Sequence, residues 1–149
     1  MDNPKISWKV YSQNAQDYED NNDFFAGTYK TGETMSIDMM IWNNKNGLFR
    51  VKDVENFVIS VSFHCLEDTT LLKFLTGEID NTIVSPTIVG DTMAVFPAPA
   101  GKIISGKAND GSIKNTENFI KFKLYLSVPD KYVVKANELK TITLDVIQE

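Results

Sequence analysis

The clearest fold signal in the sequence is the run Phe119-Ile120-Lys121-Phe122-Lys123-Leu124-Tyr125-Leu126-Ser127-Val128. From Ile120 onward, apolar residues occupy every second position, and lysine, tyrosine and serine fill the positions between them. Successive side chains of a β-strand point to opposite faces. The run therefore predicts a strand with one buried face and one wetter face.

Similar alternation occurs elsewhere along the chain. Four further runs show it, at Ile6–Val10, Met35–Ile41, Phe57–Phe63 and Ile142–Val146. Weaker strand candidates are Leu71–Ile79, Thr82–Val89, Thr92–Phe96, Lys102–Ser105 and Phe24–Tyr29. The best helix candidate, Asp68–Leu75, is short and fits a strand equally well. These patterns predict an all-β fold, a two-sheet antiparallel sandwich of seven to nine strands.

Turn-forming residues separate these runs. The cluster Asn43–Gly47 predicts a turn, with positive φ favoured at Asn46-Gly47. The polar, acidic stretch Gln13–Asp23 predicts a loop. The stretch Phe96–Gly101 is apolar and contains two prolines, which cannot donate to a sheet ladder.

Composition limits the class of protein. The chain has 149 residues, 42 % hydrophobic and 23 % charged, which predicts one globular domain over residues 1–149. Its net charge is −5 and Arg50 is its one arginine, which argues against a nucleic-acid partner. Residues 1–5 lack the features of a signal peptide, and no apolar run is long enough to span a bilayer. We therefore expect no membrane partner and leave the localisation open, with assembly into a virus particle as one route.

The sequence offers little catalytic or metal-binding chemistry. His64 and Cys65 are the one histidine and the one cysteine, and as strand neighbours they should face opposite sides. We expect a surface histidine, a small buried thiol, no cofactor and no zinc site. The acidic stretch Asp17–Asp23 contains oxygen ligands of the kind that calcium takes, but it lacks the glycine and distant glutamate of an EF-hand, and a solvated loop explains it better.

One part of the pattern resembles a known fold family. Tyr29-Lys30-Thr31-Gly32-Glu33-Thr34 leads into an alternating strand that ends at Trp42-Asn43-Asn44, and a second strand begins near Asn56-Phe57. This resembles the passage from the B strand to the C strand in immunoglobulin-like sandwiches, without their Cys…Trp…Cys spacing. Small, cysteine-poor sandwiches of this kind are similar to decoration and accessory domains of bacteriophage particles. The resemblance implies a non-catalytic structural or interaction module that self-assembles or binds a protein partner.

Two segments are candidate partner-binding elements. The apolar loop after Phe96 would place that ring as an anchor, while Pro97 and Pro99 would lower the cost of ordering. The alternative for this loop is an inter-sheet connection packed over the core. The N-terminal strand, with Ile6 and Trp8, could add to the sheet of a neighbour. On that hypothesis, deleting residues 1–10 would abolish assembly and leave the domain folded.

Two other functions compete with this interpretation. The first is a carbohydrate-binding module, in which Trp42 and Tyr29 form a stacking platform. Trp42 falls in the polar phase of its strand, which predicts an exposed ring. The second is a hydrolase, which requires two carboxylates to converge in a pocket.

Overall fold

β-strands make up most of the regular structure in the computed structural model. The model describes residues 1–12, 17–20, 23–24, 27–28, 34–64, 69–90, 92–127, 138–139 and 141–148. Within these ranges the helical elements are two short 3₁₀ helices, η1 (Thr69–Phe74) and η2 (Thr116–Asn118). Every pairing between the described strands is antiparallel. The prediction of an all-β chain with antiparallel sheets is confirmed.

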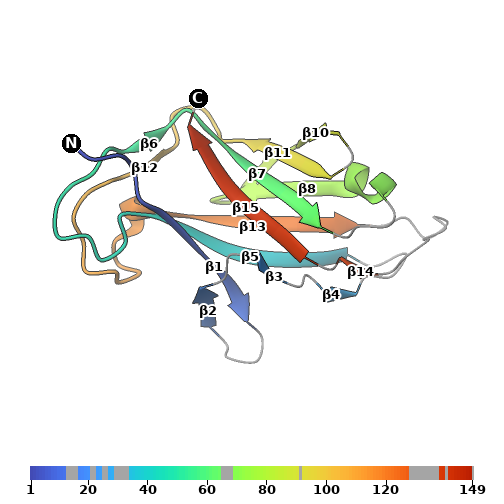
Figure 1. The fold of residues 1–149 in the computed structure, drawn as a ribbon, viewed down its shortest axis with the longest axis horizontal. Helices are drawn as coiled ribbons and strands as arrows, with labels where there is room; N and C mark the ends of the chain where they lie inside the picture. The colour runs from blue at the N-terminus through green and yellow to red at the C-terminus, as the bar shows by residue number, and fades with distance from the viewer. Residues whose placement is uncertain are drawn as a thin grey trace.

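The larger sheet has six strands in the order β2-β1-β5-β13-β8-β9 (Figure 1). Their bounds are β2 (Asp17–Asp20), β1 (Ile6–Ser12), β5 (Thr34–Asn43), β13 (Phe119–Ser127), β8 (Leu75–Ile79) and β9 (Thr82–Val84). The two longest of these strands, β5 and β13, pair side by side along their length. They form the centre of the sheet.

The second sheet has five strands in the order β10-β11-β7-β15-β3. Their bounds are β10 (Thr87–Val89), β11 (Met93–Pro97), β7 (Phe57–His64), β15 (Thr141–Gln148) and β3 (Asp23–Phe24). Two short ladders complete the fold: β12 (Ile103–Ile104) with β6 (Val54–Glu55), and β14 (Glu138–Leu139) with β4 (Gly27–Thr28). The chain passes repeatedly between the two large sheets, and the steps from β5 to β7 and from β13 to β15 join strands that lie inside both sheets.

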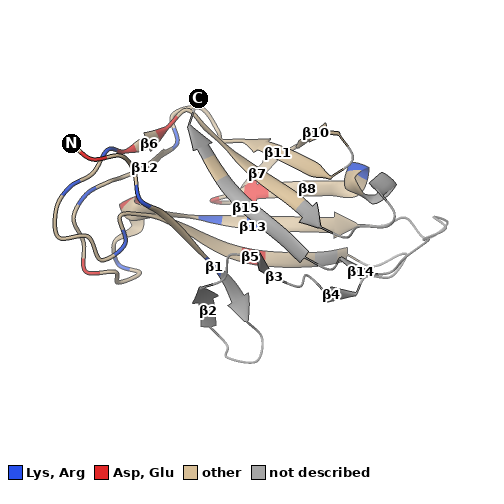
Figure 2. Cartoon of the chain, viewed as in Figure 1, with Lys and Arg blue, Asp and Glu red and all other residues tan. Residues whose placement is uncertain are grey.

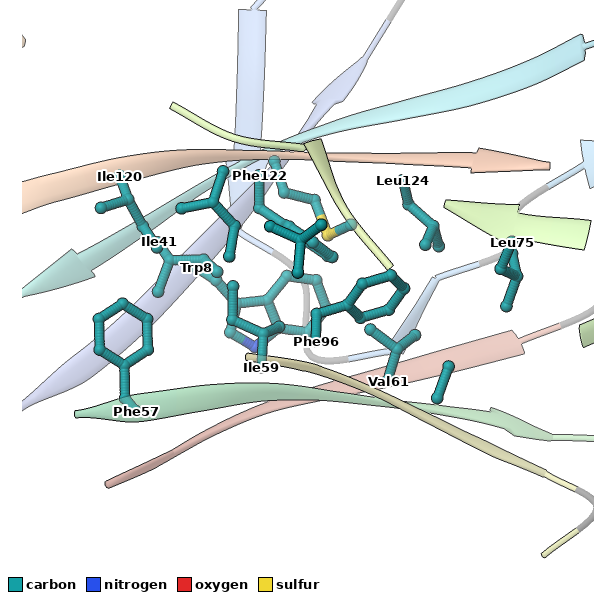
Figure 3. Packing of buried hydrophobic residues seen from close by; sticks show 14 of the residues in the cluster. Trp8, Ile41, Phe57, Ile59, Val61, Leu75, Phe96, Ile120, Phe122 and Leu124 are labelled. Carbon is teal, nitrogen blue, oxygen red and sulfur yellow. The ribbon is translucent and has the colours of Figure 1, made fainter. Parts of the chain in front are cut away.

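The main core lies between these two sheets. The six-stranded sheet contributes Ile41, Ile120, Phe122 and Leu124, and the five-stranded sheet contributes Phe57, Ile59, Val61 and Phe96. Figure 3 shows these side chains projecting from strands on both sides into a shared layer. The period-two pattern therefore predicted the buried face of these central strands correctly.

The weaker strand candidates give mixed outcomes. Leu71–Ile79 divides into the end of η1 and strand β8. Thr82–Val89 divides at Ser85-Pro86 into β9 and β10, which lie at the edges of different sheets. The stretch Gln13–Asp23 is not a loop throughout, because β2 lies within it and pairs with β1. That correction follows from backbone pairing, which the polar composition did not predict.

A second, smaller apolar cluster lies on the opposite face of the six-stranded sheet. It contains Met40, Trp42 and Phe119, which alternate with core residues along β5 and β13. The ring centroids of Trp42 and Phe119 are 4.7 Å apart, and Lys45 Nζ lies 5.3 Å from the Trp42 ring centroid. Trp42 is 1 % exposed, so the prediction of an exposed ring is wrong.

Candidate interaction site

Two loops come together where β5 ends and β13 begins. The first covers residues 44–53 and the second covers residues 105–118. Asn44 and Asn46 have φ values of 58° and 60°, in the left-handed region that asparagine tolerates better than most residues. The predicted turn at Asn43–Gly47 is confirmed, with positive φ at Asn46 but not at Gly47. This turn directs the chain away from the sheet.

Buried asparagine side chains hold the two loops, by hydrogen bonds within each loop and between them. Asn44 Nδ2 donates to the Phe49 carbonyl oxygen at 2.8 Å and to the Gly106 carbonyl oxygen at 2.9 Å. Asn118 Nδ2 donates to the carbonyl oxygens of Ser105 and Lys107 at 3.0 and 2.8 Å. An amide supplies two donors, so each of these side chains satisfies two carbonyl groups at once.

Asn43 adds the N-terminal segment to this network. Its Nδ2 donates to the carbonyl oxygens of Lys52 and Ile104 at 2.9 and 3.1 Å, and its Oδ1 accepts from the Lys5 N–H at 2.9 Å. Among the side chains that the structure describes, no buried nitrogen or oxygen lacks a partner. A fully satisfied buried polar network fixes one loop conformation rather than several.

A close backbone approach reinforces the junction. Val51 N–H donates to the Gly106 carbonyl oxygen at 2.9 Å, and Gly106 N–H donates to Asp53 Oδ1 at 2.8 Å. A Cβ at position 106 would overlap the backbone carbonyl of Val51, so the position requires glycine. Asp53 also pairs with Arg50 at 3.1 Å. The first loop is therefore held on both sides of its outermost residues.

The outermost residues of this loop are apolar. Leu48 is 86 % exposed and Phe49 is 82 % exposed, while Ile113 on the second loop is 71 % exposed. Solitary exposed apolar residues are ordinary, but two adjacent large ones on a rigid loop are characteristic of a contact surface. We call Leu48 and Phe49 the apolar tip. Sequence reasoning missed it, although this adjacent pair directly follows the predicted turn.

A groove of about 500 Å³ lies between the apolar tip and the N-terminal segment. Its wall includes the apolar tip and Ile6, and its charged lining residues are Asp2, Lys5, Lys45 and Arg50. Three basic groups stand against one acidic group in this lining, with Arg50 also paired to Asp53, although the whole chain carries −5. Figure 2 shows basic segments, with some acidic ones between them, along the loops at the N-terminal end.

The predicted anchor of the proline-rich loop lies elsewhere. Phe96 is 0 % exposed and packs edge-on against Phe122 in the main core, with ring centroids 5.1 Å apart. It cannot anchor a partner, so that prediction is wrong. Pro97 is exposed at the end of β11 opposite Val58, and Pro99 is half-buried. The alternative correctly predicts that Phe96 packs in the core, although the residue belongs to strand β11 and not to a connection.

The N-terminal strand is part of the sheet. Trp8 is buried in the main core, and Ile6 is partly buried against it. Strand β1 pairs with β5 along Ile6–Val10 and with β2 on its other side. The strand is thus not available for addition to a neighbour as predicted. Deleting residues 1–10 would remove a core tryptophan and should unfold the domain.

The structure does not describe the side chains of the remaining sequence candidates. Tyr29, Cys65 and the side chains of Asp17–Asp23 lie outside the described part of the chain, and His64 is described only as the last residue of β7. Within the described ranges, no group of three or more histidine, cysteine, aspartate or glutamate side chains could hold a metal ion. No helix in the same ranges is long and apolar enough to cross a membrane.

A charged row crosses the outer face of the six-stranded sheet. Asp38, Lys123 and Glu78 occupy opposite positions on β5, β13 and β8, beside a groove of about 240 Å³. Lys123 Nζ lies 3.5 Å from Asp38 Oδ1, and the Tyr125 hydroxyl donates to Glu78 Oε2 at 2.6 Å. Each carboxylate therefore already has a partner. The row resembles a cross-strand ionic ladder more than a hydrolytic pair.

Two groups in this row have perturbed pKa values. The hydrogen bond to Glu78 is the main cause that raises the pKa of Tyr125 above its ordinary value. The charge of Asp38 is the main cause that raises the pKa of Lys123. Both shifts stabilise the protonated form, so neither group is prepared to act as a base near neutral pH.

Comparison with known proteins adds little to this geometry. No family model matches the chain, and no curated protein matches it. One solved structure, described as "AvmM Catalyzes Macrocyclization in Alchivemycin A Biosynthesis", is similar with a TM-score of 0.34 and 13 % identity. That match covers 84 % of this chain and 74 % of the other chain. A likeness this distant carries no argument about fold or activity.

Proposed function

We propose that this chain is a non-catalytic structural and interaction module that contacts a partner protein through its apolar tip. The observation that carries the proposal is the exposure of Leu48 and Phe49, at 86 % and 82 %, on a loop held by buried side chains. Binding hot spots are typically large apolar or aromatic side chains. A loop that is already ordered avoids much of the entropy cost of binding.

The strand order supports an immunoglobulin-like sandwich as the fold of this module. With β1, β5, β7, β8, β13 and β15 taken as strands A to F, the larger sheet contains the order A-B-E-D. Strands β7 and β15 then supply the C–F pair of the facing sheet. The elements β9 to β12 form an insertion between D and E, and β11 pairs with β7. This insertion departs from the pattern of immunoglobulin domains.

An accessory role on a phage particle is the biological setting that we propose for the module. Its support is the sequence resemblance to decoration and accessory domains. A carbohydrate-binding function is not proposed, because the tryptophan of its platform is buried beside Phe119. Hydrolysis likewise has no specific support, because each carboxylate of the charged row is already bound to a neighbouring side chain, Asp38 to Lys123 and Glu78 to Tyr125.

Site-specific photocrosslinking tests the proposal. A photoreactive phenylalanine analogue is placed at Phe49 or, as a matched control, at Ile83, which is 73 % exposed on β9. The full chain is then irradiated in the cells that make it, and the products are identified by mass spectrometry. We expect one protein species crosslinked from position 49 and none from position 83. Absence of a product from position 49, or the same products from both positions, would overturn the proposal.

A further inference from the structure

The groove beside the apolar tip has a definite chemical character. Ile6, Leu48 and Phe49 give it apolar walls. Lys5 and Lys45 outnumber Asp2 among its charges, and its third basic residue, Arg50, is paired with Asp53. A ligand that complements it must be acidic and must also offer some apolar surface. This inference rests on the proposed function and asks which partner the apolar tip binds.

The same chain carries a segment with the complementary character. Strand β2 has the sequence Asp17-Tyr18-Glu19-Asp20, with three acidic residues, one aromatic residue and no basic residue. It is the edge strand of the six-stranded sheet, and its partner in that sheet is β1. An edge strand presents backbone donors and acceptors that a second chain can use.

The acidic strand and the groove of one copy lie apart. Asp17 is opposite Ser12, at the far end of β1, whereas Ile6 lines the groove and is opposite Asn43. Six residue steps along β1 separate these ends by about 20 Å. Figure 1 likewise shows the β1–β2 hairpin projecting away from the loops at the N-terminal end. The complementary surfaces can therefore meet only between copies.

We propose that the groove beside the apolar tip binds the acidic edge strand β2 of a second copy of this chain, head to tail. The two contacting surfaces are different, so after the first contact one copy keeps a free β2 and the other keeps a free groove. Such a heterologous contact builds a ring if its rotation closes and an open filament if it does not. A short strand in a groove of about 500 Å³ makes a small interface, so we expect weak association.

Light scattering over a concentration series tests the proposal. The mass of the wild-type chain should rise with concentration and fall back toward the monomer at high salt, because charge complementarity is screened. Phe49→Asp should weaken association by about 30-fold or more. The triple variant Asp17→Asn, Glu19→Gln and Asp20→Asn should also weaken it. Ile83→Asp, which places the same charge on a distant exposed apolar residue, should leave it unchanged.

A mixing experiment separates a head-to-tail contact from any symmetric one. Phe49→Asp retains an intact β2, and the β2 variant retains an intact groove. An equimolar mixture of the two should therefore form a dimer and nothing larger, although each variant alone stays monomeric. Adding Lys5→Glu to the β2 variant, which supplies the groove, should weaken the mixed dimer. Adding Lys114→Glu to the same variant should not, because Lys114 is exposed outside the groove lining. Circular dichroism confirms that each variant is folded.

The outcomes distinguish this inference from the proposed function. A wild-type chain that stays monomeric at every concentration, or variants that fail to dimerise on mixing, would overturn the second copy as partner. If position 49 nevertheless crosslinks to a different protein, the interaction module stands with another partner. If position 49 crosslinks to nothing, the proposed function itself is overturned.

Discussion

Asn44 fixes the backbone of Phe49 while the Phe49 ring remains in solvent. The Asn44 Nδ2 donates to the Phe49 carbonyl oxygen at 2.8 Å, and Phe49 is 82 % exposed. Asn44 itself is 2 % exposed. One buried amide therefore gives a surface aromatic residue a defined position.

Replacing this amide by a carboxylate should be costly. In Asn44→Asp the new oxygen would face the carbonyl oxygens of Phe49 and Gly106 without a proton to donate. We expect the free energy of unfolding to fall by about 3 kcal/mol, measured by urea denaturation. The matched control is Asn56→Asp, at an exposed residue that also has positive φ, where we expect a change within about 0.5 kcal/mol. Equal losses in the two variants would contradict this role of the amide.

The buried position of Trp42 makes a second prediction. Trp42→Ala should lower the free energy of unfolding by about 3–5 kcal/mol, because it empties the space beside Phe119 and Met40. The fluorescence spectrum should also lose the emission of a tryptophan that is shielded from solvent. Denaturant unfolding measures the first effect and emission spectra the second. A variant that keeps wild-type stability would mean that the ring lies in solvent after all.

Trp42 also illustrates the limit of strand periodicity. Alternation correctly separates Ile41 from Trp42 onto opposite faces of β5, because the pleat fixes that relation locally. Whether the second face is covered depends on Phe119, a residue far along the chain that strand pairing brings beside Trp42. No local pattern contains that information. The main core was therefore predictable, and the second cluster was not.

The interaction site likewise combines a local feature that the sequence predicts with long-range contacts that it does not. The turn at Asn43–Gly47 was predictable because asparagine and glycine tolerate its backbone angles. The position of the apolar tip depends on hydrogen bonds from Asn44 to the carbonyl groups of Phe49 and, in the second loop, Gly106, which composition does not specify. In the same way, the prolines after Phe96 left open whether its ring anchors a partner or packs over the core, and only the pairing of β11 with β7 places it in the core.

The hydrogen bond between Tyr125 and Glu78 makes stability depend on pH in the alkaline range. The pKa of Tyr125 is raised in the folded chain, so its stabilising effect is complete below the ordinary tyrosine value of 10.0. The effect is lost as pH rises through the folded pKa. Above pH 10 the urea midpoint of the wild type should therefore fall more steeply than that of Tyr125→Phe.

Glu78→Gln provides the control for the cause of this shift. Removing the carboxylate should return the pKa of Tyr125 toward 10.0, measured by ultraviolet absorbance titration of tyrosinate. Parallel midpoint curves for the wild type and Tyr125→Phe would argue that the hydroxyl does not hold Glu78 in solution.

Gly77 tests how tightly the two sheets are packed. A Cβ at this position of β8 would lie 2.6 Å from Phe96 Cδ1 and 3.1 Å from Phe122 Cε1. Both rings are buried in the core, so Gly77→Ala must displace a ring that has little room to move. We expect a loss of about 1–3 kcal/mol in the free energy of unfolding. This loss outweighs the small gain in stability that alanine gives by lowering the conformational entropy of the unfolded chain.

The double variant identifies Phe96 as the obstacle. Phe96→Leu alone should destabilise the chain by leaving a cavity, but the smaller side chain makes space for a methyl group at position 77. Gly77→Ala combined with Phe96→Leu should thus lose less stability than the sum of the single variants, by about 1 kcal/mol or more. Urea denaturation of the four proteins in the cycle gives this coupling energy. Strictly additive losses would mean that the phenylalanine ring does not contact Gly77 in solution.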